Sequence, residues 1–241
     1  LPDDCDLLLT GRDGDRLAES AQRLGQGGRR VEWIAADLAT ARGREAVIER
    51  AKAMDIDLFI ANAGMGALGP FVQNDPVREA ATVELNVVAP VVLSRALLPG
   101  MLSRAKREGG RAGLIVLSSS LAYLPVPYLA SYAASKAFDL VFTESLAEEL
   151  RGEAIDVLAL CPGPTRTSFG GRAGFSRPYL PGAVSPDSVA REGLLALGRR
   201  QVLVTGRAEQ AALSPVMLAR HVLSGALGKA MRRVLQRQER A

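Results

Sequence analysis

Short apolar runs alternate along this chain with segments whose apolar residues recur every three or four positions. The runs are typical of strands buried on both faces, and the second pattern predicts helices that cover a sheet. The predicted strands are residues 7–9, 31–35, 58–60, 113–117, 155–160 and 202–204. The predicted helices are residues 15–24, 41–54, 76–104, 131–149 and 186–197. This alternation predicts an α/β fold with a parallel sheet between helices.

Two segments depart from the regular pattern. Pro90 lies inside the long predicted helix and predicts a kink there. Residues 168–186 are rich in glycine, proline and arginine, and they follow the carboxyl end of a strand, where ligands bind in open α/β sheets. We interpret this segment as a lid, with an ordinary surface loop as the alternative. Its aromatic and basic residues suit a bulky apolar ketone or a lipid-like acyl group: Phe169, Phe175, Tyr179, Arg166, Arg172 and Arg177.

The length of 241 residues fits one domain, which we divide into a core, 1–207, and a basic helical tail, 208–241. The net charge is +4, and the residues from 220 onward hold six cations against one carboxylate. The core is therefore close to neutral, which argues against nucleic-acid binding. The tail has one apolar stripe with basic flanks, which suits either a membrane surface or packing on its own domain or a partner subunit.

The cysteine and histidine content limits which metal sites and catalytic residues the chain can have. Cys5 and Cys161 lie far apart without metal-ligand spacing, which favours a reduced, cytoplasmic protein with no metal site. His221 is the only histidine, so a catalytic set with more than one histidine is excluded. The longest apolar run, 85–102, contains two prolines and an arginine, and we interpret it as a buried helix rather than a membrane span.

Tyr132 and Lys136 are the main candidates for catalysis, because positions four apart lie on one face of a helix. A cation about 4 Å from a phenol favours the phenolate by on the order of 4 kcal/mol at an effective dielectric of ~20, which suits general acid–base catalysis. Ser119 leaves a predicted strand thirteen residues upstream of Tyr132 and adds a hydroxyl that could hold a carbonyl oxygen. A surface lysine and a half-buried tyrosine that share a helix are the plain alternative.

With Ser119, this pair resembles the short-chain dehydrogenase/reductase family, and further motifs extend the resemblance from about residue 7 to 205. Ala61-Asn62-Ala63-Gly64 is similar to the family's Asn-Asn-Ala-Gly element beside the cofactor, with alanine in the first position. Asp37 resembles the acidic residue that hydrogen-bonds the adenine.

Two later motifs also match the family. Asn86 resembles the helix asparagine that completes a catalytic tetrad by holding a water against the lysine. The turn after the strand at 155–160 is similar to the family's Pro-Gly turn, which fixes the nicotinamide amide. Its expected cofactor contacts are Pro162, Gly163, Thr165 and Thr167.

The resemblance implies an oxidoreductase that transfers a hydride between NADPH and a ketone or secondary alcohol, and that acts as a homo-oligomer. Ser119 and Tyr132 would bind the substrate oxygen, and Tyr132 would donate the proton. Lys136 would bond the nicotinamide ribose. Arg12 follows the first visible strand, where an arginine suits a 2′-phosphate, so NADP(H) is favoured over NAD(H). A solvated turn arginine is the alternative.

The family's opening strand and its Thr-Gly-x-x-x-Gly-x-Gly turn have no good match, and residues 10–14 imitate that turn poorly. Arg12, Asp37 and Asn62 are spaced by twenty-five residues each, which fits the second, third and fourth strands of the family. We therefore expect a doubly wound Rossmann-type sheet that is N-terminally incomplete. The alternative function is a binding or scaffold protein that has kept the fold and lost the dinucleotide turn, although a scaffold needs no such catalytic set.

Overall fold

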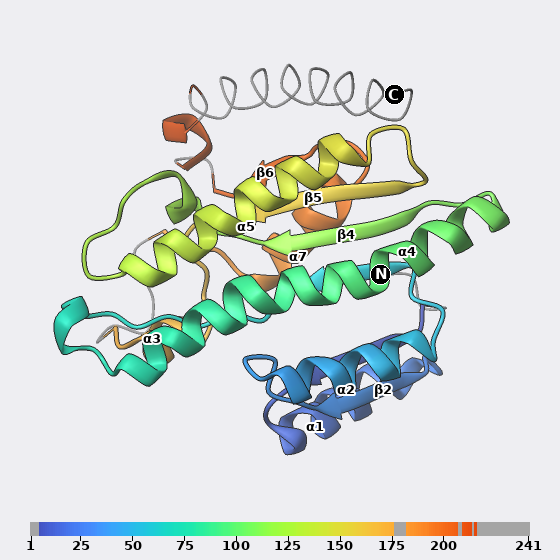
Figure 1. The fold of residues 1–241 in the computed structure, drawn as a ribbon, viewed down its shortest axis with the longest axis horizontal. Coiled ribbons are helices and arrows are strands. Elements are labelled where there is room, and N and C mark those ends of the chain that lie inside the picture. Colours follow the sequence, from blue (N-terminus) through green and yellow to red (C-terminus); the bar gives the residue numbers. More distant parts are fainter. Residues whose placement is uncertain (1–4, 176–181, 207–208, 214, 216–241) are drawn as a thin grey trace, which may run out of the picture.

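The computed structural model describes residues 5–175, 182–206, 209–213 and 215 (Figure 1). Strands and helices alternate along the chain, as predicted. In order they are β1 (Leu7–Gly11), α1 (Gly14–Leu24), β2 (Val31–Ala35), α2 (Ala41–Lys52), β3 (Leu58–Ala61), α3 (Pro76–Val83), α4 (Ala89–Glu108), β4 (Ala112–Leu117), α5 (Ala130–Glu149), β5 (Ile155–Cys161), α6 (Phe169–Ala173), α7 (Pro186–Ala196) and β6 (Val202–Val204). Short helical turns are η1 (Gly25–Gly27), η2 (Phe71–Gln73), η3 (Glu84–Val88) and η4 (Ser120–Tyr123).

The strands form two parallel sheets. One contains β1 and β2, and the other has the order β3-β4-β5-β6. Within the described residues no strand pairing joins β1 to β3, and the strand that the resemblance places between them stays a prediction. The larger sheet runs through the centre of the molecule, with the smaller one to one side (Figure 1).

The larger sheet is covered on both faces. Leu114 and Val116 of β4 pack with residues of α4 and α5, whereas Ile115 packs with residues of α7. This alternation follows from the strand geometry, in which successive side chains point to opposite faces. Because both faces are buried, β4 is apolar at every position rather than at every second one.

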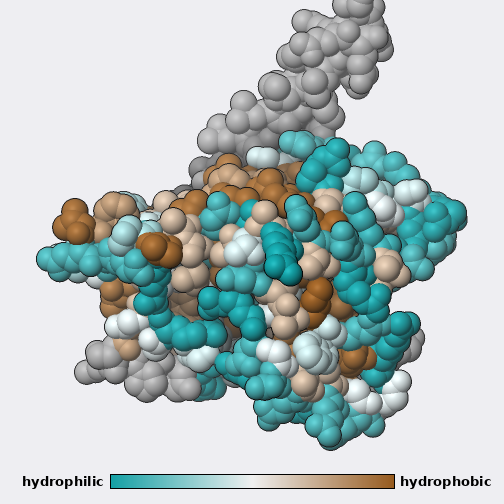
Figure 2. All heavy atoms as spheres, turned by 60° about the horizontal axis from the view of Figure 1, so that its bottom comes forward, coloured by the Kyte–Doolittle hydropathy of each residue, from teal (hydrophilic) through white to brown (hydrophobic). Residues whose placement is uncertain are grey.

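The smaller sheet shares an apolar cluster with α2 and α4, and α2 packs directly against α4. Leu38 and Val47 form a cluster with Leu85 and Leu93. None of β1, β2 and α1 contains a buried residue, and Trp33 of β2 is 43% exposed. Hydrophilic residues cover much of the face turned forward in Figure 2, with hydrophobic residues visible between them.

The long predicted helix is interrupted by a π-helical turn, η3, between α3 and α4. The interruption lies just before Pro90, which is in the first turn of α4, so the irregularity predicted at that proline is found one turn earlier. The combined stretch Pro76–Glu108 is long and apolar enough to cross a membrane by length and composition, but 44% of its apolar window is buried in the protein. Since it packs on β4, α2 and α5, we interpret it as a core helix.

Candidate active site

The carboxyl ends of β3, β4 and β5 meet at one edge of the larger sheet, where open α/β sheets bind ligands. A cavity of about 780 Å³ lies there. It is lined by most of the residues that the sequence predicted for the site: Asn62, Gly64, Ser119, Tyr132, Lys136, Pro162, Gly163, Thr165 and Thr167. Segments up to a hundred residues apart in sequence are thus brought to one place.

Ser119 follows β4 in an extended conformation and caps η4. Its Oγ accepts a hydrogen bond from the Leu121 backbone N–H at 3.1 Å, which leaves the hydroxyl hydrogen available to a ligand in the cavity. Next to it, the Ser120 N–H donates to the Pro162 carbonyl at 2.9 Å. This bond holds Ser119 and Ser120 beside the turn that follows β5.

Tyr132 lies in the first turn of α5, and its ring is held by contacts with two other segments. A β-carbon on Gly66 would lie 3.0 Å from the ring carbon Cδ2, so glycine lets the loop after β3 lie this close without displacing the ring. On α6, the ring of Phe169 lies 5.0 Å from the Tyr132 ring, centroid to centroid, at an interplanar angle of 42°. The phenol therefore has a defined position in the cavity.

Lys136 is buried and its ammonium makes two strong contacts. Nζ donates to the Leu117 carbonyl at 2.6 Å and to Oδ2 of Asp139 at 2.9 Å. Burial raises the pKa of the Asp139 carboxyl, and the charge and hydrogen bond of Lys136 act against that rise. Sequence analysis missed Asp139, although a carboxylate three residues after the lysine in an apolar helix was the available signal.

Asn86 lies in η3 and is fully buried behind the cavity. Its Nδ2 donates to the Met65 carbonyl and to Ser135 Oγ, both at 2.9 Å, and its Oδ1 accepts from the Met65 N–H at 3.0 Å. Pro90, four residues later, has no N–H to donate to the Asn86 carbonyl. Asn86 therefore ties the loop after β3 to α5 and has a main-chain carbonyl without its usual helical partner.

The two residues predicted to contact the adenosine end of a cofactor lie on the smaller sheet, outside the cavity. Arg12 follows β1, is exposed, and makes no hydrogen bond or ion pair within the described residues. Asp37 follows β2, is half-buried, and accepts a hydrogen bond from the Ala39 N–H at 3.0 Å. Ala63 is exposed beside the cavity-lining Asn62 and Gly64.

Residues 10–14 do not form a phosphate-binding turn. The Asp13 carboxylate caps α1 by accepting from the Arg16 N–H at 3.1 Å. A helix N-terminus capped by a carboxylate does not present its N–H groups to an anion. This geometry agrees with the interpretation of the sequence.

The predicted lid contains a short helix, α6, which sequence analysis treated as loop. It is bound to the loop after β3, because the Leu68 N–H donates to the Ala173 carbonyl at 2.8 Å. Arg78 joins the same two segments, since its guanidinium donates to the carbonyls of Gly66 and Arg172. Sequence analysis missed Arg78, because no local pattern relates it to a loop ninety-four residues away. Arg177 and Tyr179 lie outside the described residues.

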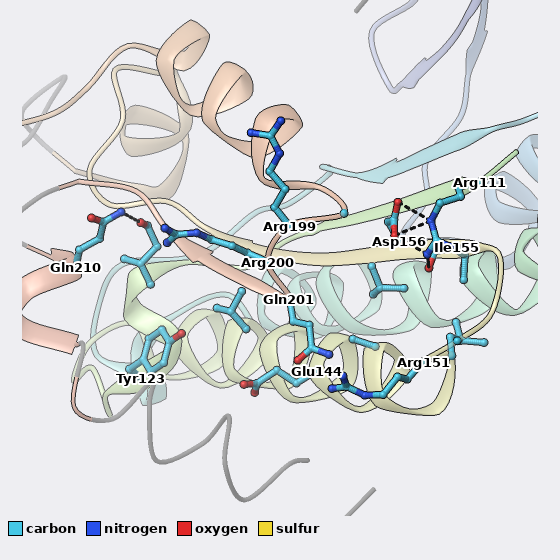
Figure 3. A pocket seen from close by; sticks show the side chains of 17 residues that line it. Arg111, Tyr123, Glu144, Arg151, Ile155, Asp156, Arg199, Arg200, Gln201 and Gln210 are labelled. Atoms are coloured by element: carbon cyan, nitrogen blue, oxygen red, sulfur yellow. Dashed lines mark hydrogen bonds and ion pairs between the residues drawn. The ribbon is translucent and has the colours of Figure 1, made fainter. Parts of the chain in front are cut away.

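A second cavity, of about 830 Å³, lies between α5, β5 and β6 (Figure 3). None of the predicted site residues lines it, and arginine side chains are prominent around it. Figure 3 shows Arg111 directed at Asp156, whose Oδ1 accepts from Arg111 Nη2 at 2.7 Å. Within the described part of the chain, no three His, Cys, Asp or Glu side chains are grouped closely enough to hold a metal ion.

A family model described as short chain dehydrogenase matches residues 1–174, and the chain belongs to that family. Among relatives, 1-deoxy-11-beta-hydroxypentalenate dehydrogenase of Streptomyces exfoliatus is 34% identical over 165 residues, which cover 67% of this chain and 58% of the relative. The chain thus spans less than two thirds of that protein's length.

Solved structures agree with this assignment. A short-chain dehydrogenase from Sphingobium yanoikuyae in complex with NADPH is 31% identical, with a TM-score of 0.77 over 89% of this chain and 84% of that one. The bulky-bulky ketone specific alcohol dehydrogenase of Comamonas testosteroni is 28% identical, with a TM-score of 0.73 over 90% of this chain and 83% of that one. The parallel α/β fold is therefore that of short-chain dehydrogenases.

Proposed function

We propose that this protein is an NADP(H)-dependent oxidoreductase that transfers a hydride between the cofactor and a ketone or secondary alcohol. The observation that carries the proposal is the meeting of Ser119, Tyr132 and Lys136 in one cavity, with Asn86 buried and hydrogen-bonded to Ser135 of α5. A fold alone does not define an activity, but these side chains form an arrangement that can bind and protonate an oxygen atom.

The residues around the cavity fit the nicotinamide half of the cofactor. Gly64 borders the cavity beside Lys136, and a β-carbon there would lie 3.6 Å from Nζ, in space that glycine leaves open. The turn after β5 supplies polar contacts on the other side through Gly163, Thr165 and Thr167. A bound nicotinamide dinucleotide would supply or take up the hydride.

The chain's own residues would handle the substrate oxygen and its proton. Ser119 and Tyr132 would hydrogen-bond that oxygen and stabilise the negative charge that develops on it, after which Tyr132 would donate its proton. Lys136, held in place by the Leu117 carbonyl, would present its positive charge to the phenol and its remaining N–H to the cofactor ribose. The main-chain carbonyl of Asn86, which receives no N–H from Pro90, would support a water in the proton path.

The walls of the cavity favour a bulky apolar substrate. Its apolar lining comes from η4, α6, the segments next to η4, α5 and α6, and the segment after β6: Leu121, Leu124, Leu129, Phe169, Phe175 and Leu213. Apolar lining with a few polar groups is typical of sites that bind largely hydrophobic molecules. The ketone specificity named for the Comamonas testosteroni structure supports the same class of substrate for this chain.

The preference for NADP(H) rests on Arg12, whose free guanidinium at the end of β1 suits a 2′-phosphate. The NADPH complex of the Sphingobium yanoikuyae structure supports this choice. A cytoplasmic homo-oligomer remains our expectation. The proposed membrane contact of the tail falls on residues 216–241, which lie outside the described residues.

The test is NADPH oxidation with a panel of bulky apolar ketones, together with NADPH binding measured by its fluorescence. Tyr132→Phe should lower kcat by ~10²–10⁴-fold and leave NADPH binding nearly unchanged, because the phenol transfers a proton. Tyr128→Phe is the matched control, since Tyr128 is 63% exposed, and it should stay close to wild type. More than about a tenth of the activity in Tyr132→Phe would refute the assignment. Wild-type protein without NADPH binding would favour the scaffold alternative.

A further inference from the structure

The ion pair between Lys136 and Asp139 is buried, whereas most ion pairs in proteins lie at the surface. The two side chains are 6% and 1% exposed, and the distance from Nζ to Oδ2 is 2.9 Å. A second pair with the same spacing joins Glu148 of α5 to Arg151, just beyond the end of the helix, but there the arginine is 51% exposed. The pair at Lys136 is thus the one on α5 that is withdrawn from water at both ends.

A buried pair of this kind seldom adds to stability, because removing two charges from water costs about as much as their attraction returns. The second oxygen of Asp139, Oδ1, is buried and has no hydrogen-bond partner among the described residues, which increases that cost. Groups kept at such a cost are concentrated at functional sites. Lys136 lines the cavity beside Tyr132, so the position of this pair points to the reaction rather than to the fold.

We propose that Asp139 is a positioning residue of this active site: its carboxylate holds the Lys136 ammonium and offsets its charge, and thereby sets the pH range in which Tyr132 exchanges its proton. The role in turnover rests on the proposed function. Two of the three ammonium donors are used, by Leu117 and Asp139, so one direction is left toward the cavity. Asp139 touches neither substrate nor cofactor and acts through the lysine.

The charged groups on the elements that pack against α5 are engaged elsewhere. Their hydrogen bonds pair Glu84 with Arg44, Glu79 with Asn74, Arg78 with Gly66, and Asp156 with Arg111. On α5 itself, Glu144 lies on the rim of the second cavity. The Cys161 thiol of β5 is neutral at ordinary pH, because burial raises its pKa to about 12. Asp139 is therefore the carboxylate in direct contact with the catalytic ammonium.

A negative charge near an acidic group disfavours its deprotonated form, so removing that charge lets the group lose its proton at lower pH. Positions 132 and 139 are two turns apart, or about 10 Å along the helix. At that distance and an effective dielectric of ~20, one unit charge moves a titration midpoint by about one pH unit. Asp139→Asn should therefore shift the titration of the Tyr132 phenol, and the pH profile of kcat/KM, about one unit toward lower pH.

The experiment follows the near-ultraviolet absorbance of the phenolate as pH rises, which requires neither cofactor nor turnover. Each protein is compared with its own Tyr132→Phe counterpart, so that the other tyrosines cancel. Asp139→Val is a second neutral variant in case Asp139→Asn does not fold. Glu148→Gln is the matched control, because Glu148 is a buried carboxylate of α5 that forms an ion pair of the same spacing with Arg151 beyond the helix end.

The expected result is a midpoint about one pH unit lower in Asp139→Asn or Asp139→Val and an unchanged midpoint in Glu148→Gln. An unmoved midpoint in a folded Asp139 variant would overturn the proposal. So would an equal shift in Glu148→Gln, since the effect would then come from charge anywhere on α5. A shifted titration without any ketone reduction by the wild type would instead refute the proposed function alone.

Discussion

The two sheets differ most in how deeply their strands are buried. In β5, six of the seven residues are buried, whereas β1 and β2 have no buried residue at all. Both sheets are parallel, and β1 and β2 are also mainly apolar in sequence, so composition alone does not explain the difference. The larger sheet has helices on both faces and neighbours on both sides of β4 and β5, while β1 is paired with β2 alone.

This difference separates the proposed chemistry from the proposed cofactor choice. Ser119, Tyr132 and Lys136 are positioned by β4 and α5, in the buried part. Arg12 and Asp37 follow the strands of the smaller sheet, which has no buried residue in β1 or β2. Under the proposed function, the residues that must be held precisely are on rigid elements, and those that would select the cofactor lie on the exposed layer.

The two cysteines offer the largest contrast between these regions. Cys161 ends β5 and is fully buried, and Cys5 is half-buried just before β1. Because burial raises the pKa of the Cys161 thiol to about 12, almost no thiolate is present at pH 8, and a reagent must wait for unfolding. Cys161 should react at least ~10³-fold more slowly than Cys5 with a disulfide reagent.

Single-cysteine variants, Cys5→Ser and Cys161→Ser, assign the two rates, and guanidinium chloride should equalise them. Similar rates in the native protein would mean that β5 opens as readily as the smaller sheet. That result would contradict the burial of Cys161 at the end of β5.

The second contrast concerns the free energy of unfolding. Leu158 of β5 is fully buried between the sheet and α7, and Leu158→Ala should cost ~2–5 kcal/mol. Leu8 of β1 is only half-buried, so Leu8→Ala should cost about 1 kcal/mol, in proportion to the smaller area it removes from contact. Urea unfolding of both variants measures the difference. Equal losses would show that β1 is buried more deeply than in this structure.

Much of this comparison was accessible from the sequence, because it rests on local patterns. The apolar runs located every strand, and the spacing of Tyr132 and Lys136 placed them on one helix face. The pairing of Lys136 with Asp139 was also local, but a lysine and a carboxylate three residues apart are usually solvated, so spacing alone did not reveal their burial.

The rest depends on contacts between distant segments. Gly66 is required only because the Tyr132 ring lies against it, and Arg78 matters only because α6 folds back over the loop after β3. The short helix α6 was hidden among glycines that usually predict loop. No pattern within one segment contains such information.

A third prediction tests the exposed layer. Arg12→Asp should shift the ratio of kcat/KM values from NADPH toward NADH by about tenfold or more, because a carboxylate repels the 2′-phosphate and can bond a hydroxyl. Arg16→Asp is the control, since Arg16 is equally exposed on the next turn but lies inside α1. If Arg12→Asp leaves the ratio of the kcat/KM values for NADPH and NADH unchanged, Arg12 is a solvated turn residue without a role in cofactor choice.

The smallest effect is expected from a pair of glycines, one in each region. At Gly66 a β-carbon would lie 3.0 Å from Cδ2 of Tyr132, with Cγ at 3.2 Å and Cβ at 3.3 Å. Gly66→Ala must therefore turn the phenol slightly from its position. A modest departure from a preferred side-chain angle costs ~0.5–1.5 kcal/mol, which corresponds to a loss of about threefold to tenfold in kcat. At Gly14, the first residue of α1, the nearest atoms to a β-carbon are 3.7 and 3.8 Å away, which is ordinary contact. Gly14→Ala should leave kcat unchanged, and a similar loss in both variants would mean that the close approach at Gly66 does not set the position of Tyr132.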